Sequence, residues 1–166
     1  MPMTPDLLVV PEMYRNWGAN LTVVAATIAA VVATVLVHYE GLGLLSARLA
    51  RRQRQRRRKV LVGIAGILVL HVVEIWIFGI ACWSLMFWPA CGHIAGYSPL
   101  HLLDAVYFSA ITFSTVGFGD LAPVGPLRFL IGTESLAGLV LIAWSASFTY
   151  LEMEQFWRRD GRGERS

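Results

Sequence analysis

The chain has few charged residues. Only 15% of its 166 residues are Asp, Glu, Lys or Arg, whereas soluble domains contain about 25%. Hydrophobic residues make up 56% of the chain, above the usual level of about 45–50%. The shortage of charge argues against a water-soluble globule. The apolar excess excludes a disordered chain, because disorder requires low hydrophobicity.

The chain also has few cysteines and lacks the sequence motifs of common enzymes. Two cysteines, Cys82 and Cys91, are too few for a disulfide framework, and the sequence leaves open whether they are bridged. The sequence has no nucleotide-binding loop, no metal-ligand cluster and no Ser/His/Asp set outside its apolar runs. We therefore expect a protein that is not an enzyme and that uses no organic cofactor.

Three long apolar runs dominate what is present. They cover Leu21–Val37, Val60–Ala81 and Leu127–Leu151, and a membrane-spanning helix needs about 20 such residues. We expect an all-α membrane protein with helices at about 19–46, 60–85 and 125–152, the first of them capped by Asn20.

Basic residues predict the orientation of these helices. Eight of the 14 lie in Arg48–Lys59, and four more follow the third run, at Arg158, Arg159, Arg162 and Arg165. Both stretches should be cytoplasmic by the positive-inside rule, which puts the N-terminus and the segment 88–126 outside. We interpret Arg48–Lys59 as a solvated helical connector that binds anionic lipid headgroups, rather than as a voltage sensor or a nucleic-acid site.

The segment from Pro99 to Pro123 is apolar but too short to span. Its first part, LHLLDAVYFSAITFS, predicts a short helix that starts near Ser98 and Pro99, with Asp104 in its early turns. Because the segment should start and end on the same side, we expect it to be re-entrant. Irregular backbone survives at membrane depth only when protein buries it or when it lines a water-filled path.

The motif Thr115-Val116-Gly117-Phe118-Gly119-Asp120 follows this short helix directly. Glycines at alternate positions reach left-handed backbone angles without steric cost. A chain that alternates between left- and right-handed conformations turns successive carbonyls to one side. Several such chains around an axis could replace the water shell of a cation.

In this context the chain resembles the potassium-channel pore-domain family. ITFSTVGFGDLAP matches the end of the pore helix, the selectivity filter and the turn after it, within a match over about 60–150. The resemblance implies that carbonyls of Thr115, Val116, Gly117 and Phe118 bind K⁺ and that Gly119 and Asp120 shape the outer mouth. It also implies a homotetramer with cyclic symmetry. HVVEIW and GLVLIAWSASF are similar to the small bacterial members with three spans.

The motif departs from the family pattern at two positions. Phe118 stands where Tyr is commoner, so a hydroxyl anchor to the pore helix is missing and the rigidity of the filter is in question. Ser114 stands where Thr is usual, which keeps a hydroxyl behind the filter.

These features predict three parts: an N-terminal segment with a peripheral helix (1–59), a pore domain (60–152) and a cytoplasmic tail (153–166). The predicted function is passive, potassium-selective conduction in a bacterial plasma membrane, with K⁺ held in the filter. A less selective monovalent cation channel and a non-conducting accessory subunit of a larger channel stay as alternatives. The gating stimulus is left open.

Polar and small residues inside the spans are further candidates. Gly138 lies at the position of the family's gating hinge, although close packing against a neighbouring helix explains it equally well. His71, Glu74 and Glu134 are ionisable groups inside apolar runs, where they are costly and often functional. They predict either a polar clamp between the outer and inner helices or a proton sensor at His71.

Overall fold

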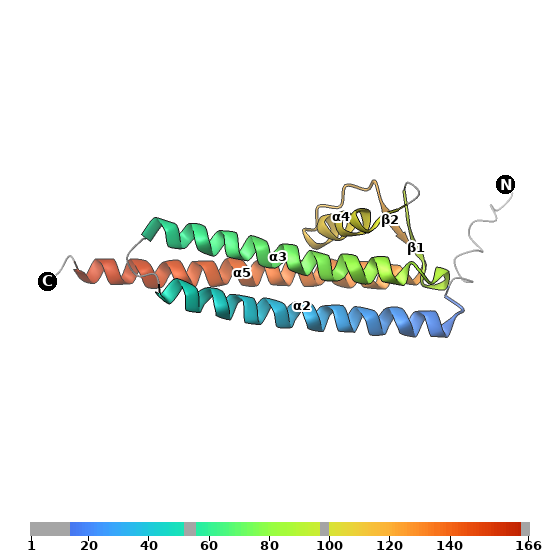
Figure 1. The fold of residues 1–166 in the computed structure, drawn as a ribbon, viewed down its shortest axis with the longest axis horizontal. Coiled ribbons are helices and arrows are strands. Elements are labelled where there is room, and N and C mark those ends of the chain that lie inside the picture. The colour runs from blue at the N-terminus through green and yellow to red at the C-terminus, as the bar shows by residue number, and fades with distance from the viewer. Residues whose placement is uncertain (1–13, 52–55, 97–99, 164–166) are drawn as a thin grey trace, which may run out of the picture.

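A computed structural model describes residues 14–51, 56–96 and 100–163 of the chain. Within these residues, four α-helices carry the fold and are joined by two short strands and two 3-10 turns (Figure 1). In chain order these are α2 (Trp17–Arg51), α3 (Arg56–Leu85), η2 (Pro89–Cys91), β1 (His93–Ala95), α4 (Leu102–Phe113), β2 (Ala122–Val124), η3 (Gly125–Leu127) and α5 (Arg128–Gly163).

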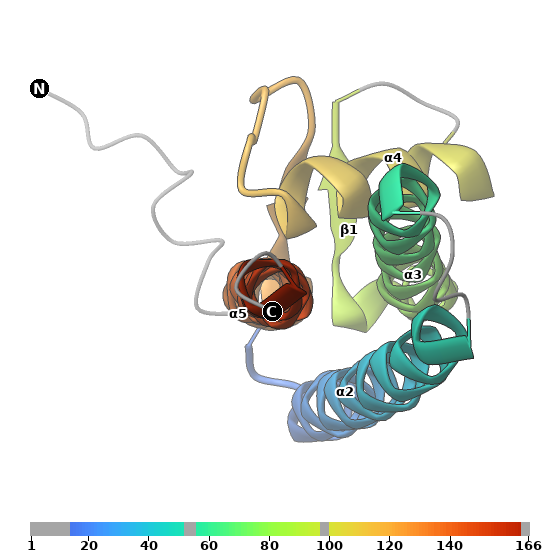
Figure 2. The same ribbon diagram turned by 90° about the vertical axis from the view of Figure 1, so that its left-hand side faces the viewer.

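Three of the helical segments are long and apolar enough to cross a membrane: Trp17–Ala50, Val60–Leu85 and Gly125–Glu154. They lie side by side, and α2 contacts both α3 and α5 (Figures 1 and 2). The helix α4 packs against α3 and α5 on the opposite face, so α2 is peripheral. The predicted all-α membrane fold with three spans and one short helix is confirmed.

The helix ends differ from the predicted ones. The helix α2 begins at Trp17 because the side-chain Oδ1 of Asn16, rather than Asn20, accepts a hydrogen bond from the amide of Ala19 at 3.1 Å. At the other end of the chain, α5 continues to Gly163 instead of ending near 152. Its last turns contain Met, Glu, Gln and Arg, all good helix formers, so no residue stops the helix at the predicted boundary.

The basic connector is helical in its described residues, as predicted. The helix α2 runs to Arg51 and α3 begins at Arg56, so the predicted boundary at 59/60 falls inside α3. The C-terminal end of α2, the N-terminal end of α3 and the C-terminal end of α5 all lie at one end of the bundle (Figure 1). The described parts of the two strongly basic stretches therefore share one end.

The segment between α3 and α5 leaves from and returns to the opposite end of the bundle. Strands β1 and β2 pair antiparallel there, with Ile94 opposite Pro123. Between them lies α4, which begins at Leu102, three residues later than predicted. The amide of His101 donates to the Asp104 carboxylate at 2.7 Å and closes a capping box. Ser98 and Pro99, the predicted start, lie outside the described residues.

The core lies where α3, α4 and α5 meet. Its largest fully buried apolar side chains are Phe78, Phe113, Leu127, Leu130 and Leu141. Cys82 and Cys91 are both buried and free, so the pair forms no disulfide in this chain. Burial raises the pKa of the Cys91 thiol, because a thiolate is poorly solvated there.

Candidate functional site

The TVGFGD segment has an alternating backbone. Thr115, Gly117 and Gly119 have φ angles of 59°, 52° and 80°, whereas Val116 and Phe118 between them are not in the left-handed region. Thr115 is the one described non-glycine residue with a positive φ. Such a conformation costs an L-residue about 1–2 kcal/mol. Left-handed residues thus alternate with ordinary ones, as the glycine spacing predicts.

The last turn of α4 is hydrogen-bonded to the backbone of this segment. The amide of Gly117 donates to the carbonyl of Ile111 at 3.0 Å, and the amide of Thr115 donates to Thr112 at 2.9 Å. Carbonyls at the end of a helix lack partners within the helix. Here the filter segment supplies those partners, so its path is fixed by the helix that precedes it. The hydroxyl of Ser114 donates back to the carbonyl of Ala110 at 2.7 Å.

A second anchor lies at the far end of the motif. The phenol of Tyr107, on α4, donates to the Asp120 carboxylate at 2.9 Å. Phe118 has no hydroxyl to offer, and its side chain is 70% exposed. Tyr107 therefore supplies a hydroxyl anchor from the pore helix to the filter loop at a different position. Sequence reasoning missed this residue because its partner lies 13 positions away.

The filter segment lies on the surface of the single chain. All residues from Thr115 to Asp120 are exposed, including Val116 at 56%. A methyl group built on Gly117 or Gly119 would meet nothing within 4 Å. The loop lies on the α4 side of the bundle, away from α2 (Figures 1 and 2). One chain therefore leaves room beside its filter strand for other polypeptide.

The helix α5 contacts α4 at two successive turns. At the first, Glu134 is hydrogen-bonded to the hydroxyl of Ser109, which also contacts the carbonyl of Ile75 on α3 at 2.8 Å. At the second, Gly138 packs against the backbone of Phe113. A Cβ atom at Gly138 would lie 2.1 Å from the Phe113 carbonyl oxygen. Close packing is therefore a sufficient reason for a glycine at this position.

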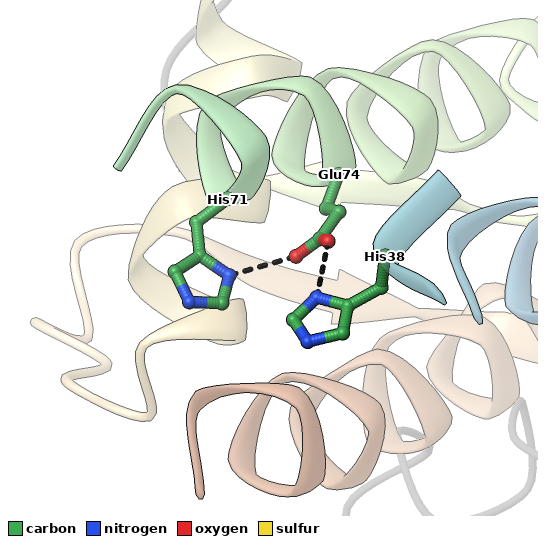
Figure 3. A network of polar contacts seen from close by, with 3 residues as sticks. All are labelled: His38, His71 and Glu74. Carbon is green, nitrogen blue, oxygen red and sulfur yellow. Dashed lines mark hydrogen bonds and ion pairs between the residues drawn. The ribbon is translucent and has the colours of Figure 1, made fainter. Parts of the chain in front are cut away.

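The predicted polar cluster divides into two groups. His71 and Glu74 are bonded, with 2.7 Å between Nδ1 and Oε2. Glu134 does not join them, because it points from α5 toward Ser109 on α4. The other oxygen of Glu74 instead lies 2.7 Å from Nδ1 of His38 on α2 (Figure 3). We call His38, Glu74 and His71 the triad; it joins α2 to α3 rather than the outer to the inner helix.

The triad has the residue types of a zinc site, and its ligand-capable atoms lie within 4.8 Å of one another. The two N–O distances of 2.7 Å are hydrogen-bond lengths. Ligands that share a tetrahedral zinc lie roughly 3.3 Å apart, because each is about 2.0–2.2 Å from the metal. The observed arrangement therefore fits protons between these atoms and does not fit a shared metal ion.

Comparison with known proteins agrees with this geometry. The model of a family described as "Ion channel" matches residues 61–154, more than half of the chain. This match covers α4, the TVGFGD segment and most of α3 and α5. The chain therefore belongs to the ion channel family, a family of channels rather than enzymes.

Similar curated proteins narrow the class. The chain is 41% identical over 63 residues to the inward rectifier potassium channel Kirbac3.1 of Paramagnetospirillum magnetotacticum. This alignment covers 37% of the chain and 21% of that protein. The chain is also 33% identical over 60 residues to the two pore potassium channel b of Oryza sativa subsp. japonica, and that alignment covers 36% of the chain and 17% of the relative. The chain is thus a member of the potassium-channel pore-domain family. It spans about a fifth of the length of these two relatives.

A third relative matches almost end to end. Protein LctB of Geobacillus stearothermophilus is 28% identical over 130 residues, which is 78% of this chain and 97% of that protein. No solved structure matches the chain significantly.

Proposed function

We propose that four copies of this chain form a potassium-selective channel whose filter is the TVGFGD segment. The alternating backbone of Thr115, Gly117 and Gly119 carries this proposal, because such a strand can direct a file of carbonyl oxygens toward one side. Four strands around an axis would present rings of carbonyls that replace the water shell of K⁺. Thr115 would add its side-chain oxygen at the innermost ring, and Gly119 and Asp120 would form the outer mouth.

The exposure of the filter supports assembly. An exposed strand with apolar side chains at Val116 and Phe118 is unsuited to a monomer. A closed ring is complete only when each subunit contributes the same strand, which favours a homotetramer with cyclic symmetry. The C-terminal end of α4 leads into the filter, so its partial negative charge would favour cations on the axis.

The proposed topology follows from the ends of the bundle. The basic end would face the cytoplasm, and the end with β1, β2 and the filter would face outside. The N-terminus would then be outside and the C-terminus inside a bacterial plasma membrane. Residues 1–59 would add a peripheral helix and the connector Arg48–Lys59, which would bind anionic lipid headgroups. Residues 60–152 would be the pore domain and 153–166 a cytoplasmic tail.

Ion flux into liposomes tests the proposal. The purified chain should carry K⁺ down its gradient, carry Na⁺ far more slowly, and be blocked by barium. Equal K⁺ and Na⁺ flux would instead establish a less selective cation channel. Absence of flux that a partner protein restores would establish an accessory subunit.

The matched variants are Gly117→Ala and Gly132→Ala. A methyl group added to either glycine would meet nothing within 4 Å in the chain, but of the two only Gly117 has a positive φ, at 52°. An alanine at Gly117 would pull the strand out of its left-handed conformation at that point. We expect this variant to lose selective K⁺ flux while Gly132→Ala keeps it. Equal flux through both variants would contradict the proposed filter.

A further inference from the structure

The triad of His38, Glu74 and His71 has a charge that must be balanced. The side chain of Glu74 is fully buried, and both of its oxygens bind imidazole nitrogens. A carboxylate out of water is costly unless a positive charge accompanies it. The sequence contains no Lys or Arg between Val60 and Leu127. The two histidines are therefore the groups in contact with Glu74 that can supply this charge.

Among the described residues, the side chains that pack on the two histidine rings from α4 and α5 are aromatic. Phe113 at the end of α4 packs against the ring of His71 at 5.7 Å between centroids, and Trp144 on α5 packs against His38 at 5.1 Å. Neither side chain titrates. The remaining buried titratable groups on the packed helices are Glu134, which binds Ser109, and Cys82, whose electrostatic neighbour is Glu134.

Counting protons gives the state of the triad. If each histidine is neutral and donates its Nδ1–H to one oxygen of Glu74, the triad carries one net negative charge. One additional proton makes it neutral. Because a buried net charge is much costlier than a buried ion pair, we infer that the triad holds this proton when the helices are packed together.

The position of the proton follows from the free ring nitrogens. Nε2 of His38 is buried and has no hydrogen-bond partner within the described part of the chain. A proton there would be an unpaired buried donor, so His38 should be neutral with its hydrogen on Nδ1. The side chain of His71 is 15% exposed. The additional proton therefore belongs to His71, whose Nε2 can exchange it with water.

We propose that the triad is a pH-sensitive latch that holds the peripheral helix α2 on the pore domain. The latch is closed while His71 is protonated, because the triad is then neutral and both hydrogen bonds to Glu74 are complete. As pH rises through the titration of His71, the proton is lost and Glu74 becomes an uncompensated buried charge. The stabilisation is therefore present at low pH and lost at high pH.

The latch also contacts the conduction site that we propose. His71 packs on Phe113, which lies two residues before Thr115 and whose backbone abuts Gly138. Opening of the latch would loosen the support behind the filter. Conduction need not occur for the latch itself to exist, so the two proposals can fail separately.

Nitrogen NMR of the ¹⁵N-histidine-labelled chain in liposomes tests the proton positions directly. As the pH is raised, His71 should pass from a charged to a neutral ring while His38 stays neutral with its hydrogen on Nδ1. The substitutions His38→Gln and His71→Gln assign the two signals. A charged His38, or a His71 whose ring charge does not change with pH while the chain stays folded, would overturn the proposal.

Amide hydrogen exchange of α2 in the same liposomes measures release of the helix. Exchange rates are first divided by the intrinsic, base-catalysed rate of an unstructured amide, so that the protection factor alone is compared between pH values. One-proton linkage predicts that the ratio of released to latched chain rises by up to about tenfold per pH unit between the titration midpoints of the released and the latched states and levels off above the latter. Glu74→Gln has no charge to balance, so its protection factors should be independent of pH. His93→Gln, at an exposed histidine on β1, is the matched control and should exchange like the unsubstituted chain. Persistence of the pH dependence in Glu74→Gln would refute the latch.

Discussion

Replacing Gly138 by alanine separates two roles for this residue. The first role is a hinge that lets α5 bend, and the second is close packing against the end of α4. In the structure, a Cβ at Gly138 would lie 2.1 Å from the carbonyl oxygen of Phe113 and 2.8 Å from its carbonyl carbon. These are backbone atoms, so no side-chain rotation can relieve the contact.

The magnitude follows from that geometry. The carbonyl oxygen of Phe113 must move by about 1.3 Å, from 2.1 Å to 3.4 Å, to reach an ordinary van der Waals separation from the new methyl group. Overpacking of this kind costs about 1–3 kcal/mol. Alanine also favours a helix over glycine by about 1 kcal/mol. The expected net change at Gly138 is a loss of about 0–2 kcal/mol of unfolding free energy.

Gly132 provides the control on the same helix. A methyl group there meets nothing within 4 Å in the chain, so Gly132→Ala should show the helix gain without the clash. Packing therefore predicts that Gly138→Ala is about 1–3 kcal/mol less stable than Gly132→Ala. Unfolding of the purified variants in detergent micelles, followed by circular dichroism, measures this difference.

A hinge predicts a different pair of results. Gly138→Ala would then be as stable as Gly132→Ala, while single-channel recordings would show a lower open probability. If the two variants have equal unfolding free energies, the packing role is wrong. If Gly138→Ala is less stable but opens normally, the hinge role is wrong.

Three further predictions concern contacts near the filter. Tyr107→Phe removes the hydrogen bond to Asp120 and should lower the unfolding free energy by about 0.5–1.5 kcal/mol. We also expect the K⁺ flux of this variant in liposomes to be less stable with time. Unchanged flux kinetics would show that this hydrogen bond is dispensable. The hydroxyl of Ser109 has one proton for two neighbours, so we expect Glu134 to be protonated and to donate the second hydrogen bond. Glu134→Gln should then be nearly as stable as the unsubstituted chain and Ser109→Ala less stable by about 1–3 kcal/mol in thermal unfolding; the reverse order would contradict a protonated Glu134. Because burial raises the pKa of Cys91, its thiol should resist maleimide at pH 7–8 until the chain is unfolded, and rapid labelling of the folded chain in a mass assay would contradict its burial.

Local features of the sequence predicted most of the fold. The three spans follow from runs of apolar residues, and the backbone of the filter follows from glycines at alternate positions. The apolar runs and the alternate glycines are local patterns, because each determines the conformation of the same residues that form it. The ends of the helices were harder to predict, because neither a cap such as Asn16 nor the absence of a stop before Gly163 changes the apolar pattern.

Contacts between distant segments were not predictable in this way. His71 and Glu74 share a helix face, so their contact could be predicted from spacing alone. His38 lies 36 residues from Glu74 and on another helix. His38 directly follows the first apolar run and lies inside the predicted helix 19–46, which indicates that it needs a partner, but the partner depends on how α2 packs. For the same reason, the sequence grouped Glu134 with Glu74, whereas α5 turns it toward Ser109.

The filter strand has a consequence for how a channel would be built. The amides of Thr115 and Gly117 are already bonded to the end of α4, and the left-handed residues of the strand are already set in a single chain. Each subunit would therefore bring a finished strand to the ring, and the entropy of shaping it would be lost during folding of the subunit rather than during association. Assembly would then resemble the docking of four rigid parts, and its rate would depend on encounters between subunits instead of on rearrangement of the loop.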